Sequence, residues 1–374
     1  MKCCRCQAEP CKCLDGQTVY VGDCLDVLRQ LPAESVQCVV TSPPYFGLRD
    51  YGVDGQIGLE VRPQEYVEKM VDVFRAVRRV LSDDGTLWLN LGDSYASDGK
   101  WGGQTGGKHA RALHGNATAN GRNKKYTGYK PKDLMGMPWQ VAFALRDDGW
   151  YLRQDIIWHK PNPMPESVTD RCTKSHEYVF LLSKSERYYY NQEAILEPVS
   201  LNTHARLSQD VERQIGSARA HAGGKTNGAM KAVGRLPSWR GSTFDDGKTG
   251  EMKRSRGGTR KLAASGSGIK NNKSFNEAVC LRVSERNKRS VWTVTTKSYK
   301  GAHFATFPPD LIEPCILAGC PEGGIVLDPF AGSGTTLQVA RKNGCRGIGI
   351  ELNPEYAKLI AKRLEQRTLF TEKA

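Results

Sequence analysis

The sequence predicts an α/β protein in which strands and helices alternate around a doubly wound, mostly parallel sheet. Two observations carry the prediction. Short β-branched segments alternate with segments whose apolar residues recur at helical spacing, in the first and the last third of the chain. In the last third, a glycine-rich turn joins one such strand to the helix that follows it.

The first half of the chain supplies part of the predicted sheet and its helices. A helix that begins near Pro63 carries apolar residues on one face as far as Leu81, and Asp83-Asp84-Gly85 after it predicts a turn. Strands are expected at 18–21, 36–40, 86–91, 151–158, 178–183 and 188–190, and helices at 24–31, 63–81 and 138–147.

The last third is the most regular α/β stretch and completes the predicted sheet. Between it and the first half lies a long polar stretch, residues 200–290, which is a natural location for a second module. The expected order is helix 309–317, strand 324–327, the glycine-rich turn, helix 335–343, strand 346–351 and helix 354–366.

The net charge of +14 and the sequence pI of about 9.2 favour a polyanionic partner. The positive charge is concentrated, because residues 95–132 hold eight Lys/Arg and one acid, and residues 200–290 hold nineteen Lys/Arg and seven acids. Both stretches are rich in small and polar residues, and 95–132 is expected to be a flexible basic insertion. Two basic segments suit a groove for a phosphate backbone, and two solvated loops are the alternative.

The apolar runs are too short to cross a bilayer, which takes about 20 residues, so no membrane partner is expected. No apolar stretch follows Met1-Lys2-Cys3-Cys4, so no signal peptide is predicted and a cytoplasmic location is expected. Seven of the twelve cysteines lie outside the first thirteen residues, mostly in apolar surroundings, and are expected to be small buried thiols rather than disulfides.

The first 16 residues form a separate cysteine-rich segment. Cys3-x-x-Cys6 followed by Cys11-x-Cys13 brings four thiols together, and four thiolates suit a tetrahedral zinc ion. The second pair is closer than the usual two-residue spacing, and one further cysteine is left over. A small zinc knuckle and a tail of reduced thiols are both open interpretations.

The glycine-rich turn is the stretch from Asp328 to Thr336, Asp-Pro-Phe-Ala-Gly-Ser-Gly-Thr-Thr. Gly332 and Gly334 let the backbone bend tightly and approach a ligand, and the helix that begins there offers unpaired N–H groups to an anion. Glu351 ends the next strand, where an acidic side chain commonly accepts hydrogen bonds from ribose hydroxyls. A Walker lysine and the third glycine of the dinucleotide pattern are both missing from this turn. A small nucleoside ligand is therefore favoured, and a tight turn without a ligand is the alternative.

The segment Thr41-Ser42-Pro43-Pro44-Tyr45 ends a predicted strand with a rigid polar turn. Two consecutive prolines restrict φ and remove two backbone donors, so the loop presents carbonyl oxygens and the Ser42 hydroxyl. Such acceptors can bind both hydrogens of an amino group while Tyr45 stacks on the planar ring that carries it. An ordinary Pro-Pro turn with a packed tyrosine is the alternative.

The two motifs in this order resemble those of the amino-group DNA methyltransferases, which act on cytosine N4 or adenine N6. The resemblance is to the permuted class, in which the catalytic loop precedes the cofactor loop. It implies a seven-stranded, Rossmann-like methyltransferase domain made of 17–199 and 291–369, with a target-recognition insert at 200–290 that binds DNA. Further agreement is found at Gly22-Asp23, Trp158-His159-Lys160-Pro161-Asn162, Arg171, His176-Glu177, Lys184, 303–308, Glu351, Tyr356 and Arg363.

The resemblance implies S-adenosylmethionine as cofactor and double-stranded DNA as substrate, with the target base flipped out of the duplex. In the implied catalytic loop of Ser42, Pro43, Pro44 and Tyr45, the Ser42 hydroxyl and the Pro43 carbonyl accept hydrogen bonds from the amino group and Tyr45 stacks on the base. The implied cofactor-binding residues are Asp23 at the adenine edge, Phe330 beside the cofactor, Glu351 at the ribose, and Asp328, Gly332, Ser333, Gly334, Thr335 and Thr336 at the methionine end. For Asp23, a helix N-terminal cap is the alternative.

The target base follows from the residues around the Pro-Pro loop. Thr41 and Ser42 at its start resemble the N4-cytosine signature and favour cytosine N4, while adenine N6 stays open. More remote alternatives are an RNA methyltransferase and a DNA-binding protein without catalysis. A cognate restriction endonuclease is compatible with the resemblance, and the sequence does not decide between a monomer and a homodimer.

Overall fold

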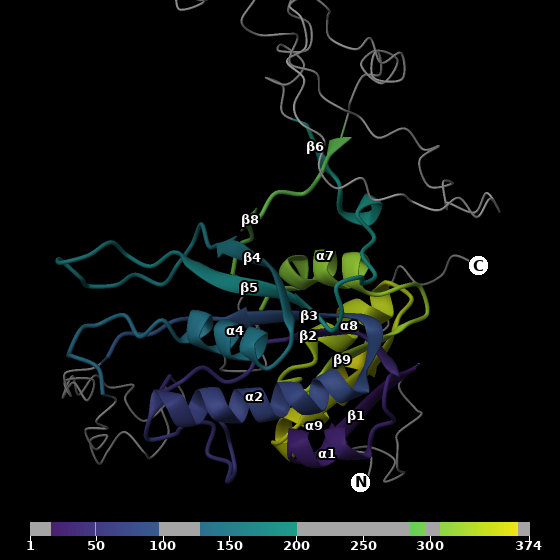
Figure 1. Ribbon diagram of the computed structural model, residues 1–374, viewed down its shortest axis with the longest axis horizontal. Coiled ribbons are helices and arrows are strands. Elements are labelled where there is room, and N and C mark those ends of the chain that lie inside the picture. Colours follow the sequence, from purple (N-terminus) through teal and green to yellow (C-terminus); the bar gives the residue numbers. More distant parts are fainter. Residues whose placement is uncertain (1–15, 49, 97–127, 200–284, 297–306, 366–374) are drawn as a thin grey trace, which may run out of the picture. The chain divides into compact units, whose positions relative to one another are not determined.

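The computed structural model describes residues 16–48, 50–96, 128–199, 285–296 and 307–365. Within these residues the chain forms an eight-stranded sheet, which belongs to the larger of two compact units (Figure 1). In the order in which they lie side by side, the strands are β1 (Gln17–Val21), β10 (Arg346–Glu351), β9 (Ile325–Asp328), β2 (Val36–Thr41), β3 (Leu81–Leu91), β5 (His176–Ser183), β4 (Tyr151–His159) and β8 (Val291–Thr293).

The strand directions show a mostly parallel sheet. The five strands from β1 to β3 are parallel to one another. β5 is antiparallel to both of its neighbours, β3 and β4, and β8 is parallel to β4. The predicted α/β fold is confirmed, with eight strands in the described sheet where seven were expected. The eighth strand, β8, has only three residues and gave no strand pattern in the sequence.

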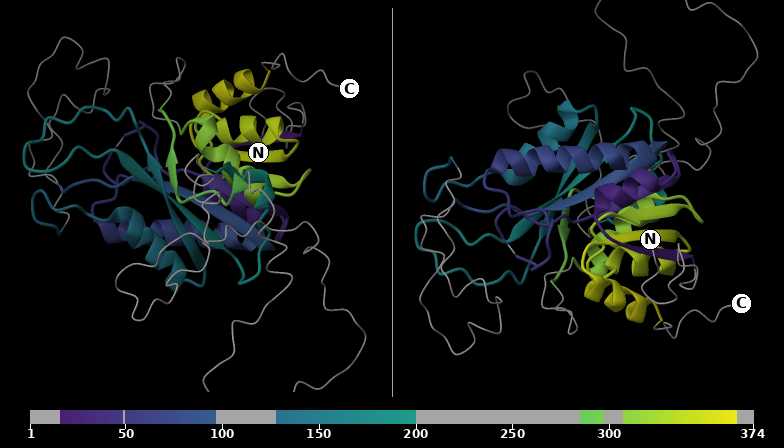
Figure 2. Two further views of the ribbon diagram at one scale, coloured as in Figure 1. Left: turned by 90° about the horizontal axis from the view of Figure 1, so that it is seen from above. Right: turned by 90° about the horizontal axis from the view of Figure 1, so that it is seen from below.

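Helices cover both faces of the sheet, as a doubly wound fold requires (Figure 2). The first face carries α1 (Cys24–Gln30), α2 (Pro63–Val80) and α4 (Met137–Asp147). The second face carries α7 (Pro309–Gly319), α8 (Thr335–Lys342) and α9 (Pro354–Glu365). A short 3-10 turn, η2 (Glu193–Ile195), packs beside α7.

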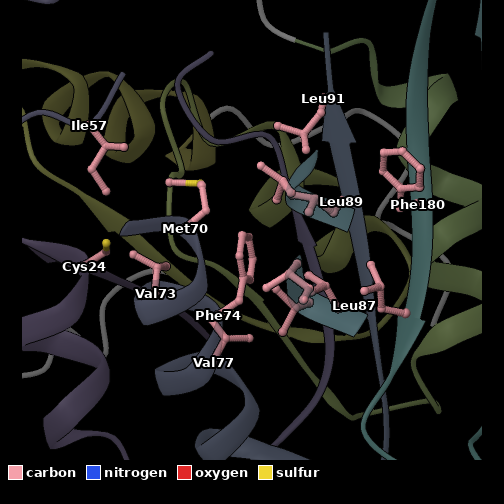
Figure 3. Packing of buried hydrophobic residues seen from close by; sticks show 14 of the residues in the cluster. Cys24, Ile57, Met70, Val73, Phe74, Val77, Leu87, Leu89, Leu91 and Phe180 are labelled. Carbon is pink, nitrogen blue, oxygen red and sulfur yellow. The ribbon is translucent and has the colours of Figure 1, made fainter. Parts of the chain in front are cut away.

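The largest part of the core lies between the first face of the sheet and α2. Met70 and Phe74 on α2 are fully buried in the same cluster as the leucines of β3, and the Phe74 ring lies beside these leucines (Figure 3). Side chains alternate across a strand, so Leu87 and Leu89 face α2 whereas Trp88 packs on the opposite face with α7. Both faces of the central strands are therefore buried, which explains their nearly continuous apolar sequences.

Two expectations for element boundaries are wrong. β3 begins at Leu81 directly after α2, and residues 82–85 are an irregularity within the strand rather than a turn before it. Residues 188–190 form no strand, because they pair with no strand ladder: the Tyr189 amide donates to the Asp84 carbonyl in the irregular part of β3, at 2.8 Å. Their aromatic alternation has another cause, since Tyr190 stacks on Trp88 with ring centroids 6.4 Å apart.

The smaller compact unit spans residues 196–288. In its described part, β6 (Glu197–Pro198) and β7 (Glu285–Arg286) pair antiparallel, and Arg286 Nε donates to Glu197 Oε1 at 2.9 Å. The cysteine-rich segment and most of the stretches 95–132 and 200–290 lie outside the described residues. Among the helices that the structure describes, none has the length and apolar character needed to span a membrane.

Candidate active site

The turn between β9 and α8 is held by the buried carboxyl group of Asp328, the last residue of β9. Its Oδ1 accepts hydrogen bonds from the Thr41 hydroxyl at 2.7 Å and the Phe330 amide at 3.1 Å. Its Oδ2 accepts a bond from the Thr336 hydroxyl at 2.6 Å. Burial raises the pKa of Asp328 to about 6, although these hydrogen bonds oppose the shift. One side chain thus joins the ends of β2 and β9 to the first turn of α8.

The backbone of this turn bends through two glycines in the left-handed region, with φ 53° at Gly332 and φ 76° at Gly334. A Cβ on Gly334 would lie 2.7 Å from Cγ2 of Ile360 on α9, so this packing leaves no room for a side chain. Among the described residues, a Cβ on Gly332 would meet the Phe330 carbonyl oxygen alone, at 3.9 Å. The bent backbone at Gly332 therefore borders open space, which suits a ligand that lies close to the turn.

Arg363 on α9 supports the same turn. Its Nη1 donates to the Ser333 carbonyl and hydroxyl oxygens, both at 3.1 Å, and to the Thr335 hydroxyl at 2.9 Å. Ser333 and Thr335 are buried, so the structure gives their hydroxyls a structural role in the turn. Contact of Ser333 and Thr335 with a cofactor stays a prediction.

Glu351 ends β10 and closes the glycine-rich turn from the neighbouring strand. Its Oε2 accepts a 2.8 Å hydrogen bond from the Gly332 amide, and its Oε1 accepts a 2.8 Å bond from the Asn353 amide. Burial raises the pKa of Glu351 to about 7, and the two backbone hydrogen bonds oppose this shift. The carboxyl group thus lies beside the open space at Gly332, where the ribose role predicted for it is sterically accessible.

Asp23 caps the N-terminus of α1. Its Oδ1 accepts hydrogen bonds from the Leu25 amide at 2.8 Å and the Asp26 amide at 3.3 Å, so the capping interpretation is confirmed. Within the described part of the chain, Oδ2 accepts no hydrogen bond. The cap uses one oxygen only, and the contact predicted for the adenine edge of a cofactor can use the other.

The Ser-Pro-Pro-Tyr loop follows β2, and neighbouring groups occupy two of its carbonyl oxygens. The Tyr66 hydroxyl on α2 donates to the Pro44 carbonyl at 2.9 Å, and the Leu48 amide donates to the Tyr45 carbonyl at 3.3 Å. The Pro43 carbonyl receives no hydrogen bond from any residue that the structure describes. It is therefore available as an acceptor, as the sequence predicts.

The Tyr45 side chain is half-buried, and its hydroxyl points toward the strands β3 and β5. Its Oη lies 2.9 Å from Glu177 Oε2 on β5 and 3.1 Å from Asn90 Oδ1 on β3. The Ser42 hydroxyl donates to the same Oη at 3.4 Å. Burial raises the pKa of Tyr45 well above its usual value, with a further contribution from the nearby Glu177 carboxylate. Tyr45 is therefore a neutral hydrogen-bond donor at physiological pH.

Two lysine side chains lie near the Glu177 carboxylate. Lys160 donates to Glu177 Oε1, and its ammonium group lies 4.2 Å from the centroid of the Trp158 ring. Lys174 donates to the Asp93 carbonyl at 3.1 Å, and burial lowers its pKa. Of the mid-chain residues that resemble the methyltransferase family, Glu177 and Lys160 are thus linked to the Ser-Pro-Pro-Tyr loop.

The two predicted loops meet at one edge of the sheet. β2 and β9 are adjacent and parallel, so their carboxyl ends lie together. The hydrogen bond between Thr41 and Asp328 joins the last residues of these strands across 287 positions of sequence. The structure therefore brings the Ser-Pro-Pro-Tyr loop and the glycine-rich turn together, as the sequence predicts.

Several residues at the site could not be assigned a role from the sequence. Asn90 and Gly92 lie at the carboxyl end of β3, and a Cβ on Gly92 would come within 2.6 Å of Tyr45 Cε2. Position at the carboxyl end of a predicted parallel strand is the one signal that could have indicated them. Glu177 and Lys160 were noticed through the family resemblance, but their link to Tyr45 is a structural finding.

The cysteine predictions have separate outcomes. Cys38, Cys315 and Cys345 are buried and form no disulfide within the described residues, which confirms the expectation for the cysteines in apolar surroundings. Cys3, Cys6, Cys11 and Cys13 lie outside the described residues. In the part of the chain that the structure does describe, no group of His, Cys, Asp and Glu could hold a metal ion. The zinc knuckle stays a prediction.

A doubly wound sheet that carries a glycine-rich turn and a Pro-Pro-Tyr loop side by side at its carboxyl edge is the architecture of the Rossmann-like methyltransferase class. Comparison with known families makes this specific. The model of the N6/N4 DNA methylase family matches residues 36–363, so the chain belongs to this family of DNA methyltransferases. The resemblance inferred from the sequence is confirmed.

Individual relatives agree with this assignment. The chain is 43% identical over 352 residues to the type II methyltransferase M.XycI of Xanthomonas campestris pv. cyanopsidis, covering 94% of this chain and 89% of the relative. It is 41% identical over 360 residues to the type II methyltransferase M.Cfr9I of Citrobacter freundii, covering 96% and 91%. Among solved structures, the cytosine-N4-specific PvuII DNA methyltransferase has the same fold, with a TM-score of 0.54 and 17% identity over 94% of this chain and 88% of that one.

Proposed function

We propose that this DNA methyltransferase transfers a methyl group from S-adenosylmethionine to the exocyclic amino nitrogen of a base flipped out of double-stranded DNA, with cytosine N4 as the target. The observation that carries the proposal is the 2.7 Å hydrogen bond between Thr41 and Asp328. It joins the strand that leads into the acceptor loop to the strand that leads into the glycine-rich turn. Donor and acceptor of a methyl group must meet within a few ångströms, and adjoining loops satisfy this requirement.

The residues of the glycine-rich turn fit the proposed cofactor. When bound, S-adenosylmethionine supplies an electrophilic methyl group on a sulfonium centre. Glu351 would accept hydrogen bonds from its ribose hydroxyls, and Oδ2 of Asp23 would accept one at its adenine edge. The space beside Gly332 would hold its methionine end, and Phe330 would pack beside the cofactor. Asp328 and Thr336 hold the turn that shapes this site.

The acceptor loop makes the target amino group reactive. An exocyclic amino nitrogen is a poor nucleophile, because its lone pair is delocalised into the aromatic ring. The Ser42 hydroxyl and the Pro43 carbonyl accept its two hydrogens, which favours a tetrahedral nitrogen whose lone pair points toward the methyl group. The Tyr45 ring stacks on the flipped base and holds it in position.

The preference for cytosine rests on the start of the loop. Thr41 and Ser42 match the N4-cytosine signature more closely than the adenine signature. Adenine N6 is the second candidate target, because some adenine enzymes share the serine form of the loop. The basic stretch 200–290 is proposed to contact DNA phosphates and to read the recognition sequence.

The experiment that tests the proposal follows a labelled methyl group. The purified protein is incubated with S-adenosylmethionine labelled in the methyl group and with duplex DNA, RNA or free nucleotides, and the modified nucleosides are identified by mass spectrometry. We expect label in DNA only, as N4-methylcytosine, and loss of most label with the Ser42→Ala variant. N6-methyladenine would refute the cytosine assignment, and label in RNA alone would refute the DNA substrate.

A further inference from the structure

The hydroxyl groups at the catalytic loop form a chain with a defined direction. Ser42 Oγ lies 3.4 Å from Tyr45 Oη, which in turn lies 2.9 Å from Glu177 Oε2 and 3.1 Å from Asn90 Oδ1. Each hydroxyl has one proton and can both donate and accept, so its direction depends on the groups at the end of the chain. Here both terminal groups, a carboxylate and an amide oxygen, are acceptors.

The amide of Asn90 has a determined orientation. Its Nδ2 donates to the Tyr178 carbonyl at 3.0 Å, so its Oδ1 is the atom turned toward Tyr45. The Glu177 carboxylate is held by Lys160 on its other oxygen, and the side chains of this ion pair are only 16% and 18% exposed. Little solvent therefore screens the pair, and the Tyr45 proton is drawn toward β3 and β5, away from Ser42.

We propose that Glu177 and Asn90 are positioning residues, which act through the Tyr45 hydroxyl to hold the Ser42 hydroxyl as a hydrogen-bond acceptor for the target amino group. The Tyr45 hydroxyl donates its hydrogen bond to Glu177 or Asn90, so the Tyr45 oxygen accepts a hydrogen bond from the Ser42 hydroxyl. The lone pairs of Ser42 Oγ are then left for the amino hydrogens. The inference rests on the proposed function of the same loop.

The same direction of the chain prevents an unproductive arrangement. A serine hydroxyl without a partner for its proton could donate it to the base and compete for the lone pair that must attack the methyl group. With its proton directed toward Tyr45, Ser42 can only accept from the amino group. Preorganised acceptors of this kind favour the transition state because no group has to reorient during the reaction.

A double-mutant cycle tests the inference, because the Tyr45 hydroxyl should matter only through Ser42. The Tyr45→Phe variant keeps the ring for stacking and removes only the hydroxyl. We expect it to slow single-turnover methyl transfer about tenfold, which corresponds to the loss of one hydrogen bond, and to leave the Kd values for DNA and cofactor within about twofold. In the Ser42→Ala background, the same substitution should cost no further rate.

The Glu177→Gln variant provides a second cycle with Ser42→Ala. We expect it to slow methyl transfer less than Tyr45→Phe, because Asn90 Oδ1 still accepts the Tyr45 proton, and again to have no effect without Ser42. This second cycle still tests the inference if the Tyr45→Phe variant does not fold correctly, which circular dichroism and thermal melting would reveal. Tyr151→Phe, an exposed tyrosine at the start of β4, is the control and should keep the wild-type rate.

The outcomes separate the two proposals. A wild-type protein that transfers no methyl group to a base amino group contradicts the proposed function. Wild-type activity with additive losses in both cycles overturns the inference about Glu177 and Asn90, because additivity means that Tyr45 acts without Ser42. Losses that appear in Kd rather than in the single-turnover rate overturn it as well, since they indicate a role in base stacking.

Discussion

The Glu351 side chain combines a structural role with a proposed ligand role in one carboxyl group. It closes the glycine-rich turn through the amides of Gly332 and Asn353, and burial raises its pKa to about 7. This pKa in the folded state is above the ordinary value of 4.5. The folded protein therefore holds a proton more tightly than the unfolded chain, and stability contributed by the neutral carboxyl group is lost as the pH rises from 4.5 to 7.

The same pKa predicts a pH dependence of cofactor binding. Only the carboxylate can accept both ribose hydrogen bonds, so protonation of Glu351 should weaken binding as the pH falls through about 7. If the ionised form alone binds, the Kd for S-adenosylmethionine should be about tenfold higher at pH 6 than at pH 8, as measured by isothermal titration calorimetry. The Glu351→Gln variant should bind weakly and without this dependence. An equal pH dependence in wild type and variant would assign it to another group.

Gly92 is required by the position of the Tyr45 ring. A Cβ at residue 92 would lie 2.6 Å from Tyr45 Cε2 and 3.0 Å from Cδ2, so Gly92→Ala must displace the ring. A displacement of about 1 Å at a catalytic loop can cost about a hundredfold in rate. We expect a loss of this order in single-turnover methyl transfer.

The origin of this loss can be verified by stability measurements. Gly92→Ala should lower the melting temperature of the wild-type protein but not that of a Tyr45→Ala variant, in which the ring is absent. Equal lowering in both backgrounds would show that Gly92 is needed by the β3 backbone rather than by Tyr45.

At the scale of elements, Asp328 joins two strands and a helix. Its carboxyl group accepts hydrogen bonds from β2 through Thr41, from α8 through Thr336 and from the Phe330 amide. Asp328→Ala would remove the acceptor of the buried Thr41 hydroxyl and of the Phe330 amide, whereas the Thr336 hydroxyl would keep its 3.3 Å bond to the Val40 carbonyl. We expect the variant to reduce the free energy of unfolding by about 2–4 kcal/mol in urea denaturation. Glu355→Ala, an exposed change on α9, should alter it by less than about 0.5 kcal/mol. Equal stability of Asp328→Ala and wild type would contradict this structural role.

The sequence predicts best those elements whose own residues show a strand or helix pattern. β1, β2, β9 and β10 have short β-branched sequences bounded by helix signals, and their expected bounds agree with the structure to within one residue. β8 has three residues, and its strand geometry is imposed by its neighbour β4. A local pattern carries no information about such tertiary pairing, so the sequence predicts neither β8 nor the antiparallel position of β5 between β3 and β4.

In the candidate site, too, features set by local sequence could be predicted and features set by tertiary pairing could not. The two loops could be predicted, because prolines and glycines restrict the backbone locally and because adjoining carboxyl ends follow from a parallel sheet. The Tyr45–Glu177 hydrogen bond spans 132 positions and depends on the order of strands, so no spacing in the sequence indicates it. Sequence reasoning thus found the groups proposed to touch ligands but not the contacts through which Glu177 and Asn90 reach Tyr45.

At the scale of the whole molecule, the stretch 200–290, which carries a large excess of positive charge, is separate in sequence from the loops proposed to carry out catalysis. The proposed catalytic loop and the glycine-rich turn lie in the unit that holds the sheet, whereas residues 200–290 contain nineteen Lys/Arg and seven acids. β6 and β7 pair antiparallel at the two ends of this stretch, with Pro198 opposite Glu285. Paired strand residues lie about 5 Å apart, so the stretch leaves and re-enters the described chain at nearly the same point.

This arrangement predicts that the stretch can be removed without disturbing the sheet. We expect a variant in which a short Gly-Ser linker replaces residues 200–284 to keep its thermal melting and its affinity for S-adenosylmethionine. Its affinity for DNA should fall and depend less on salt, because the logarithm of the binding constant falls with the logarithm of salt concentration in proportion to the phosphates contacted. Fluorescence anisotropy from about 50 to 300 mM salt measures this slope. Because the stretch is proposed to read the recognition sequence, residual methylation by the variant should also lose its site preference. A variant that kept both the salt dependence of DNA binding and the site preference would instead assign DNA recognition to the unit that contains the sheet.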